Sequence, residues 1–172
     1  MVKKAKARKA RQAKEAIERF YWDCWYGDLK GVHAALQGGL DVNTESEAGC
    51  RGLMAAVING HNAVVRLLLQ QEGIEVDIIG AYMDDQYRGA SLMTVAVERN
   101  YVDCVKLLLS DKRADPNIKD PKPDYEDYLG FSPLMFAVKY NHVDCVKLLL
   151  ADPRVDLMTR DGYMRSEEEV VR

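Results

Sequence analysis

The octapeptide VDCVKLLL occurs at residues 102–109 and again at residues 143–150. Eight identical residues in a row are not expected by chance, so the chain contains an internal repeat. Weaker copies are AVVRLLL at residues 63–69 and LKGVHAAL at residues 29–36. The 172 residues therefore hold four related copies of one pattern.

A second helical pattern precedes each copy, at residues 53–59, 92–99 and 134–140, and in the first copy as an apolar stripe of Ile17, Phe20, Tyr21 and Cys24. Each repeat is thus predicted to be a first helix, a tight turn and a second helix. Left-handed Gly or Asn residues are expected to end the first helices, at Gly27, Gly60, Asn100 and Asn141. Ser132 and Pro133 are predicted to start a helix, as its cap and its first residue.

These residues resemble the ankyrin family, whose repeat reads roughly G-x-T-P-L-H-x-A, then Gly-His, then a V-V-x-L-L-L helix and G-A-D-V-N. The stretch GFSPLMFAVKYNHVDCVKLLL at residues 130–150 follows this pattern, and residues 49–69 and 89–109 follow it with substitutions. The resemblance covers about residues 17–156. Local departures are Asp23, at a position where a small apolar residue is expected, and Arg51-Gly52 in place of Thr-Pro.

The resemblance implies an all-α repeat solenoid of helix-turn-helix repeats with projecting β-turn fingers, about four repeats plus a partial C-terminal cap. We expect a basic N-terminal extension at 1–14, an ankyrin-repeat domain at 15–160 with repeats at roughly 15–45, 46–85, 86–126 and 127–160, and a partial fifth repeat or cap at 161–172. The last segment has the capping-box spacing of Ser166 and Glu169.

The spacing of the predicted turns indicates where the chain departs from a regular repeat. The turn recurs after 33 residues between Gly27 and Gly60, but after 40 and then 41 residues in the following repeats. The extra length falls after Asp77 and Asp115, so two long fingers are predicted there. The Leu-rich second helices, with Cys104, Cys145, Leu108 and Leu149, are expected to form the core, and the first helices and fingers to face outward.

Composition sets limits on the classes of function. No apolar run reaches the roughly 20 residues needed to cross a bilayer, and no apolar segment follows the basic start as in a secretory signal, so we expect no membrane role. The four cysteines form no CxxC pair and are read as reduced thiols. We therefore expect a cytoplasmic or nuclear protein, or one found in both.

The resemblance also implies where a partner binds: at the ends of the first helices and on the fingers. Aromatic residues and Arg recur there, as in interface hot spots. The fingers, which include AYMDDQYR, also carry acids at Asp84, Asp85, Glu126 and Asp127. One hypothesis is that these acids engage a basic segment of the partner, and the alternative is that the fingers are solvated loops that keep the protein soluble. Carried over by position, the predicted partner-binding residues are Trp25, Tyr26, Ile58, Asn59, Tyr87, Arg88, Glu98, Arg99, Tyr128, Leu129, Phe131, Lys139 and Tyr140.

Catalysis is not indicated. The chain has no phosphate-binding loop, no nucleophile elbow and no Cys, His and carboxylate set at nucleophile spacing. His142 and Cys145 form H-x-x-C on one predicted helix, but a zinc site needs more ligands. We therefore expect no enzyme activity, no catalytic residue, no metal, no cofactor and no small-molecule substrate.

The leading hypothesis is a protein-interaction module, a scaffold or adaptor. One alternative is the substrate-recruiting fragment of a larger multidomain enzyme such as a ubiquitin ligase, kinase or acyltransferase. Another is a nucleic-acid-associated adaptor that uses the basic N-terminal arm, where seven Lys or Arg and no acid lie within residues 1–14. The remaining 17 bases and 27 acids leave the body at about −10, which argues against phosphate binding. Two further functional readings of the arm are a solvated extension and a nuclear import signal. Structurally, the arm either extends the first helix or stays disordered until it is bound.

Overall fold

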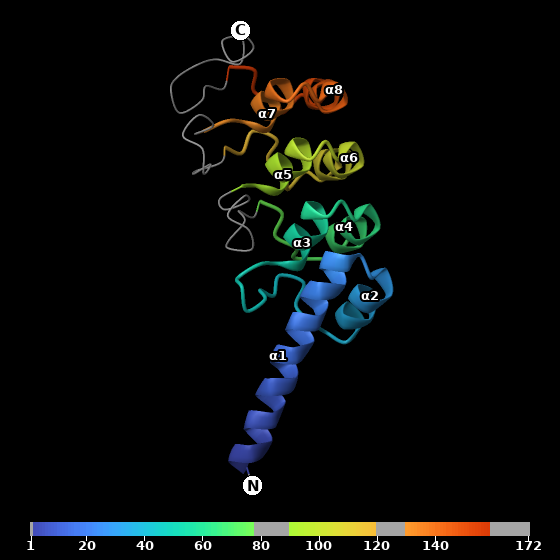
Figure 1. The fold of residues 1–172 in the computed structure, drawn as a ribbon, viewed down its shortest axis with the longest axis vertical. Helices are drawn as coiled ribbons and strands as arrows, with labels where there is room; N and C mark the ends of the chain where they lie inside the picture. Colours follow the sequence, from blue (N-terminus) through green and yellow to red (C-terminus); the bar gives the residue numbers. More distant parts are fainter. Residues whose placement is uncertain (1, 78–89, 120–129, 159–172) are drawn as a thin grey trace. The chain divides into compact units, whose positions relative to one another are not determined.

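The computed structural model describes residues 2–77, 90–119 and 130–158. Within these ranges the chain forms helices joined in pairs by tight turns, with one isolated bridge between Glu45 and Arg51. The prediction of an all-α repeat fold is confirmed (Figure 1). The first helices of the pairs are α1 (Val2–Tyr26), α3 (Gly52–Ile58), α5 (Leu92–Glu98) and α7 (Pro133–Lys139), and the second helices are α2 (Leu29–Gln37), α4 (Asn62–Leu69), α6 (Val102–Ser110) and α8 (Val143–Ala151).

The chain divides into two compact units, Met1–Ile74 and Glu75–Arg172, each of which holds two helix pairs. In the amino-terminal unit α1 contacts α3, α2 contacts α4, and each first helix contacts its own second helix. The carboxyl-terminal unit repeats this arrangement, with α5 against α7 and α6 against α8. Each unit is therefore a layer of two first helices packed on a layer of two second helices.

The turns inside the helix pairs form as predicted. Gly27, Gly60, Asn100 and Asn141 have φ of 75°, 68°, 55° and 56°, so all four adopt the left-handed conformation. At the start of α7, the Ser132 side chain accepts a hydrogen bond from the Met135 backbone N–H, and Pro133 is the first helical residue. In contrast, Arg51 at the start of α3 makes no side-chain cap, in line with the missing Thr-Pro.

The expectation that the second helices form the core while the first helices face outward is wrong. All residues of α3 are buried, as are residues 92–97 of α5 and 133–137 of α7. The second helices bury only one side, with Val64, Val65 and Leu68 as the buried residues of α4. A first helix is covered on several sides because it contacts both a neighbouring first helix and its own second helix.

The predicted core positions of the second helices are nevertheless correct. Cys104, Cys145, Leu108 and Leu149 are fully buried. All four cysteines are buried and free. Burial raises the pKa of Cys50 and of Cys104 to about 11, which keeps these thiols protonated and unreactive near neutral pH.

The basic N-terminal residues extend the first helix, as one of the two readings of that segment predicts. Helix α1 begins at Val2, and side chains 4–16 are exposed along it. Figure 1 shows this part of α1 running away from α2 and α3. Lys14 forms an ion pair with Glu47 at 2.7 Å, and Arg11 pairs with Glu15 one helical turn away.

Two features predicted from the sequence, the body of the long fingers and the partial fifth repeat, lie outside the described residues. Of the finger stems, Asp77 and Asp115 are described, and the Asp77 carboxylate accepts a hydrogen bond from the Asp115 backbone N–H at 2.9 Å. None of the helices in the described ranges has the length and apolar character needed to cross a membrane.

Candidate functional site

The structure places some of the predicted partner-binding residues in each unit. Trp25, Tyr26, Ile58 and Asn59 belong to the amino-terminal unit, and the carboxyl-terminal unit holds the others that are described. Asn59, Arg99 and Tyr140 are the C-cap residues of α3, α5 and α7, so these positions do lie at the ends of first helices. The finger residues Tyr87, Arg88, Tyr128 and Leu129, with the acids Asp84, Asp85, Glu126 and Asp127, lie outside the described residues.

An aromatic cluster occupies the end of α1 and consists of Tyr21, Trp22, Trp25 and Tyr26. The rings of Trp22 and Tyr26 stack with centroids 5.7 Å apart and planes at 22°. Trp25 packs edge-on against Trp22 at 6.2 Å. Trp22 is 42% exposed and Tyr26 is 71% exposed, whereas Tyr21 is buried beneath them. The cluster therefore offers a stacked pair of rings to solvent.

Trp22 was missed by the sequence reasoning, which took only the last two residues of the predicted helix. Trp22 and Tyr26 are four residues apart, the spacing at which side chains on a helix become neighbours. Applying this spacing to FYWDCWY would have identified the stacked pair.

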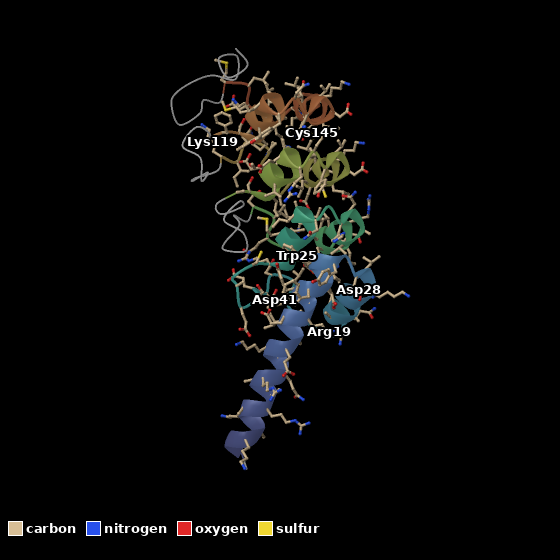
Figure 2. The ribbon with its side chains drawn as sticks, in the orientation of Figure 1. Arg19, Trp25, Asp28, Asp41, Lys119 and Cys145 are labelled. Atoms are coloured by element: carbon tan, nitrogen blue, oxygen red, sulfur yellow. The ribbon has the colours of Figure 1, made fainter. Side chains whose placement is uncertain are left out.

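The end of α1 is held in place by the turn of the next repeat. The His61 Nε2 atom lies 2.8 Å from the Trp25 carbonyl oxygen, within hydrogen-bond distance. A Cβ atom at Gly27 would lie 2.8 Å from the His61 ring, so only glycine leaves room for it. Trp25 is half-buried where α1 meets α3 (Figure 2). These contacts fix the backbone that presents Trp22 and Tyr26.

The prediction that Ile58 is an exposed contact residue is wrong. Ile58 is buried, because α3 has no solvent-facing side. Asn59 follows it and is half-buried, with its side-chain amide donating to the Ala55 carbonyl at 2.9 Å. Of this pair, Asn59 alone remains a candidate contact.

The prediction of Phe131 as an exposed finger residue is also wrong. Phe131 is buried, and its ring packs edge-on against Phe136 at 5.4 Å. Phe131 precedes the helix cap Ser132, and Phe136 is the fourth helical residue of α7, so the two rings form a hydrophobic staple. The side chain anchors the start of α7 instead of facing a partner.

A second aromatic surface lies at the end of α7 in the carboxyl-terminal unit. Tyr140 is 39% exposed and is stacked between Phe136, at 6.3 Å, and His142, at 5.8 Å. The His142 Nε2 atom lies 3.1 Å from the Glu98 carbonyl oxygen, which joins this turn to the end of α5. Arg99 and Lys139 are exposed at the ends of the same two helices.

Glu98 is half-buried in this second surface. Burial raises the pKa of the Glu98 carboxyl, and the nearby charges of Arg99 and His142 oppose that rise. The structure thus brings together Glu98, Tyr140 and His142 at one end of the unit. The contact of His142 with the Glu98 carbonyl links the turn of one repeat to the first helix of the preceding repeat.

The H-x-x-C pair has ordinary structural contacts. Cys145 lies with its sulfur 3.4 Å from the Asn100 side-chain oxygen, while His142 contacts Glu98 as described above. Among the described residues, no group of three or more His, Cys, Asp or Glu side chains is placed to hold a metal ion.

Two family models match the sequence of this chain. A family model described as "Ankyrin repeats (3 copies)" matches residues 20–120. A second, described as "Ankyrin repeats (many copies)", matches residues 120–166. A search of curated proteins finds no match to the chain.

Proposed function

We propose that this chain, which belongs to the ankyrin-repeat family, binds a protein partner through the ends of its first helices. Ankyrin repeats are generally protein-protein interaction modules. The observation that supports the proposal most is the exposed, stacked pair of Trp22 and Tyr26 at the end of α1.

The energetics of the ring pair favour a contact surface. Large aromatic side chains left in water give up the stabilisation that burial would provide, and they are the residues most often found as interface hot spots. Trp22 and Tyr26 restrain each other by stacking, and Trp25 supports them from the side. A partner that covers them would therefore lose little side-chain entropy on binding.

The first experiment identifies and measures the partner. The intact chain captures binding proteins from cell lysate, and calorimetry then measures the affinity of the purified partner for the intact chain and for Trp22→Ala/Tyr26→Ala. We expect the double variant to weaken binding by at least about tenfold, as loss of a hot spot does.

A matched control removes exposed apolar side chains elsewhere. Val143 and Leu150 on the second helix α8 are 50% and 54% exposed, so Val143→Ser/Leu150→Ser is expected to leave partner affinity unchanged. Circular dichroism should be the same for all three proteins. Equal affinity of the Trp22→Ala/Tyr26→Ala variant and the intact chain would show that the aromatic cluster is not the binding surface.

The finer part of the proposal concerns the charge of the partner. We propose that the acidic finger residues Asp84, Asp85, Glu126 and Asp127 steer a basic segment of the partner toward the site. Reversing these four charges to Lys should slow association and reduce its dependence on salt. Unchanged association kinetics would contradict this part and leave the aromatic contact standing.

We also propose a cytoplasmic or nuclear location. Support comes from the four cysteines, which are free and buried, as in proteins kept in a reducing compartment. Imaging of a fluorescent fusion in cells checks the location, and secretion of the fusion would contradict it.

A further inference from the structure

A groove of about 490 Å³ lies between the two second helices of the amino-terminal unit, α2 and α4. Its volume is within the range of sites that hold ligands. The groove is formed by second helices, whereas the aromatic cluster lies on the first helix α1. It is lined by Leu29, Lys30, His33, Ala63, Arg66, Leu67 and Gln70.

The lining combines apolar side chains with bases and contains no acid. Leu29, Ala63 and Leu67 give the groove an apolar surface, and Leu29 is 42% exposed. Lys30, His33 and Arg66, all exposed, line it as well. Within the part of the chain that the structure describes, no carboxylate forms an ion pair with these three residues.

In the carboxyl-terminal unit, the bases at the corresponding helix positions form ion pairs with acids. Helices α2, α4, α6 and α8 align on their N-caps, which are Asp28, His61, Tyr101 and His142. Lys106 pairs with Asp103 at 3.5 Å in α6, and Lys147 pairs with Asp144 at 3.3 Å in α8.

In the amino-terminal unit the bases remain while the acids are replaced. His33 and Arg66 align with Lys106 and Lys147, but the positions of Asp103 and Asp144 hold Lys30 and Ala63. The second helices of this unit therefore carry positive charge without an acid one turn earlier to neutralise it. Lys30 and Ala63, the two positions that differ, both line the groove.

We propose that the groove between α2 and α4 binds an acidic amphipathic segment of a partner protein. Carboxylates of the segment would approach Lys30 and Arg66, and an apolar side chain would lie over Leu29, Ala63 and Leu67. The apolar lining distinguishes this occupant from a nucleic acid, whose phosphates would meet the bases but gain nothing from the leucines.

The test uses the full chain and two synthetic probes. One is a fluorescein-labelled peptide with a pair of leucines one helical turn apart between glutamates, and its twin has lysines in place of the glutamates. We expect the acidic probe to bind more tightly, with affinity that falls as NaCl rises from about 50 to 500 mM. Amide shifts in an NMR titration should centre on α2 and α4.

Two pairs of substitutions separate the groove from general charge. Lys30→Ala/Arg66→Ala should weaken the acidic probe about tenfold, whereas Lys106→Ala/Lys147→Ala removes the same charge from the other unit and should leave affinity unchanged. Ala63→Asp gives Arg66 the acid that α6 and α8 already have, and it should weaken binding too.

Four outcomes would overturn the proposal. The first is that the acidic probe causes no amide shift at millimolar concentration, and the second is that the lysine twin binds equally well. The third is that both double variants lose the same affinity. The fourth is that an oligonucleotide displaces the probe and shifts the same amides. Circular dichroism of each variant checks that it is folded. Ala63→Asp is expected to fold, because α6 and α8 have Asp at the same helix position.

Discussion

Tyr21 in α1 is buried at a cost to stability. Its hydroxyl has no hydrogen-bond partner among the described residues, and burial raises the pKa of the phenol. An unpaired buried hydroxyl is destabilising, so Tyr21→Phe should raise the free energy of unfolding by about 1 kcal/mol, read from the urea midpoint. A lower midpoint would mean that the hydroxyl has a partner in solution.

Asp23, two residues later, stands where the ankyrin pattern has a small apolar residue. Burial raises the pKa of its carboxyl, Asp28 adds to the rise, and Arg19 at 3.9 Å opposes it. The folded chain therefore holds this proton more tightly than the unfolded chain. Stability is lost as pH rises from the unfolded pKa, near 3.9, through the raised folded pKa, and the cost persists at neutral pH.

Asp23→Asn should remove that cost. We expect the variant to have a higher urea midpoint than the parent at pH 7, and the advantage to shrink near pH 3, where the carboxyl is protonated in both states. The same advantage at both pH values would show that shape, not charge, is responsible. Gly31 packs directly against the Asp23 carboxylate, where a Cβ would clash, so the replacement at position 23 has to keep the size of Asp.

Arg154, just after α8, forms hydrogen bonds to the end of α6 and to the turn that follows it. Its guanidinium donates to the carbonyls of Leu109 and Ala114 at 2.7 and 3.0 Å and pairs with Asp152 at 2.7 Å. Carbonyls at a helix end have no partner within the helix, so the bond to Leu109 satisfies a group that α6 leaves open, and the bond to Ala114 holds the turn that follows α6.

Arg154→Ala should lower the free energy of unfolding by about 2 kcal/mol, the order expected for hydrogen bonds to a charged group. Arg154→Lys should restore only part of it, because an ammonium lacks the planar fork. Urea unfolding measures both, with Lys112→Ala at an exposed position as the control. Full recovery with Lys would show that charge alone is sufficient.

The helix pairs could be predicted from the sequence because their signals are local. The two VDCVKLLL copies gave the repeat, and Asn100 and Asn141 marked turns that the structure confirms. The burial of the first helices differs from the prediction. GLMAAVI in α3 contains no polar residue, and a helix without a polar face is buried all round. Its seven residues are too few to show a period of their own.

Candidate contact residues were harder to predict because exposure depends on contacts across the unit. Phe131 appeared to belong to a finger, yet it packs on Phe136 as a staple, a pattern readable from its place before Ser132. The close approach of α1 and α3 at Gly52 could not be predicted either. A Cβ there would lie 2.7 Å from the Cys24 sulfur, at the point where Arg51-Gly52 replaces the Thr-Pro of the repeat pattern. No local pattern in the sequence revealed that approach.

The basic residues are concentrated at the start of α1, which is read either as a solvated extension or as a phosphate-binding arm. Residues 1–14 carry seven bases, while the remainder is acidic at about −10. The structure makes the basic stretch a helix with side chains 4–16 exposed, and its one described link to the rest of the amino-terminal unit by an ion pair is Lys14 with Glu47. Such a stretch adds little to the folded core.

Deleting residues 1–13 should therefore leave the free energy of unfolding within about 0.5 kcal/mol of the intact chain, as for surface changes away from packed groups. Partner affinity should also persist, since Trp22 and Tyr26 remain. Urea unfolding and calorimetry measure these quantities, and replacement of the six bases within residues 1–13 by Gln serves as the control that keeps the length and the Lys14 ion pair. If affinity instead falls and the lost binding depends steeply on salt, the basic helix carries the interaction, and a phosphate-bearing partner replaces the aromatic site as the explanation.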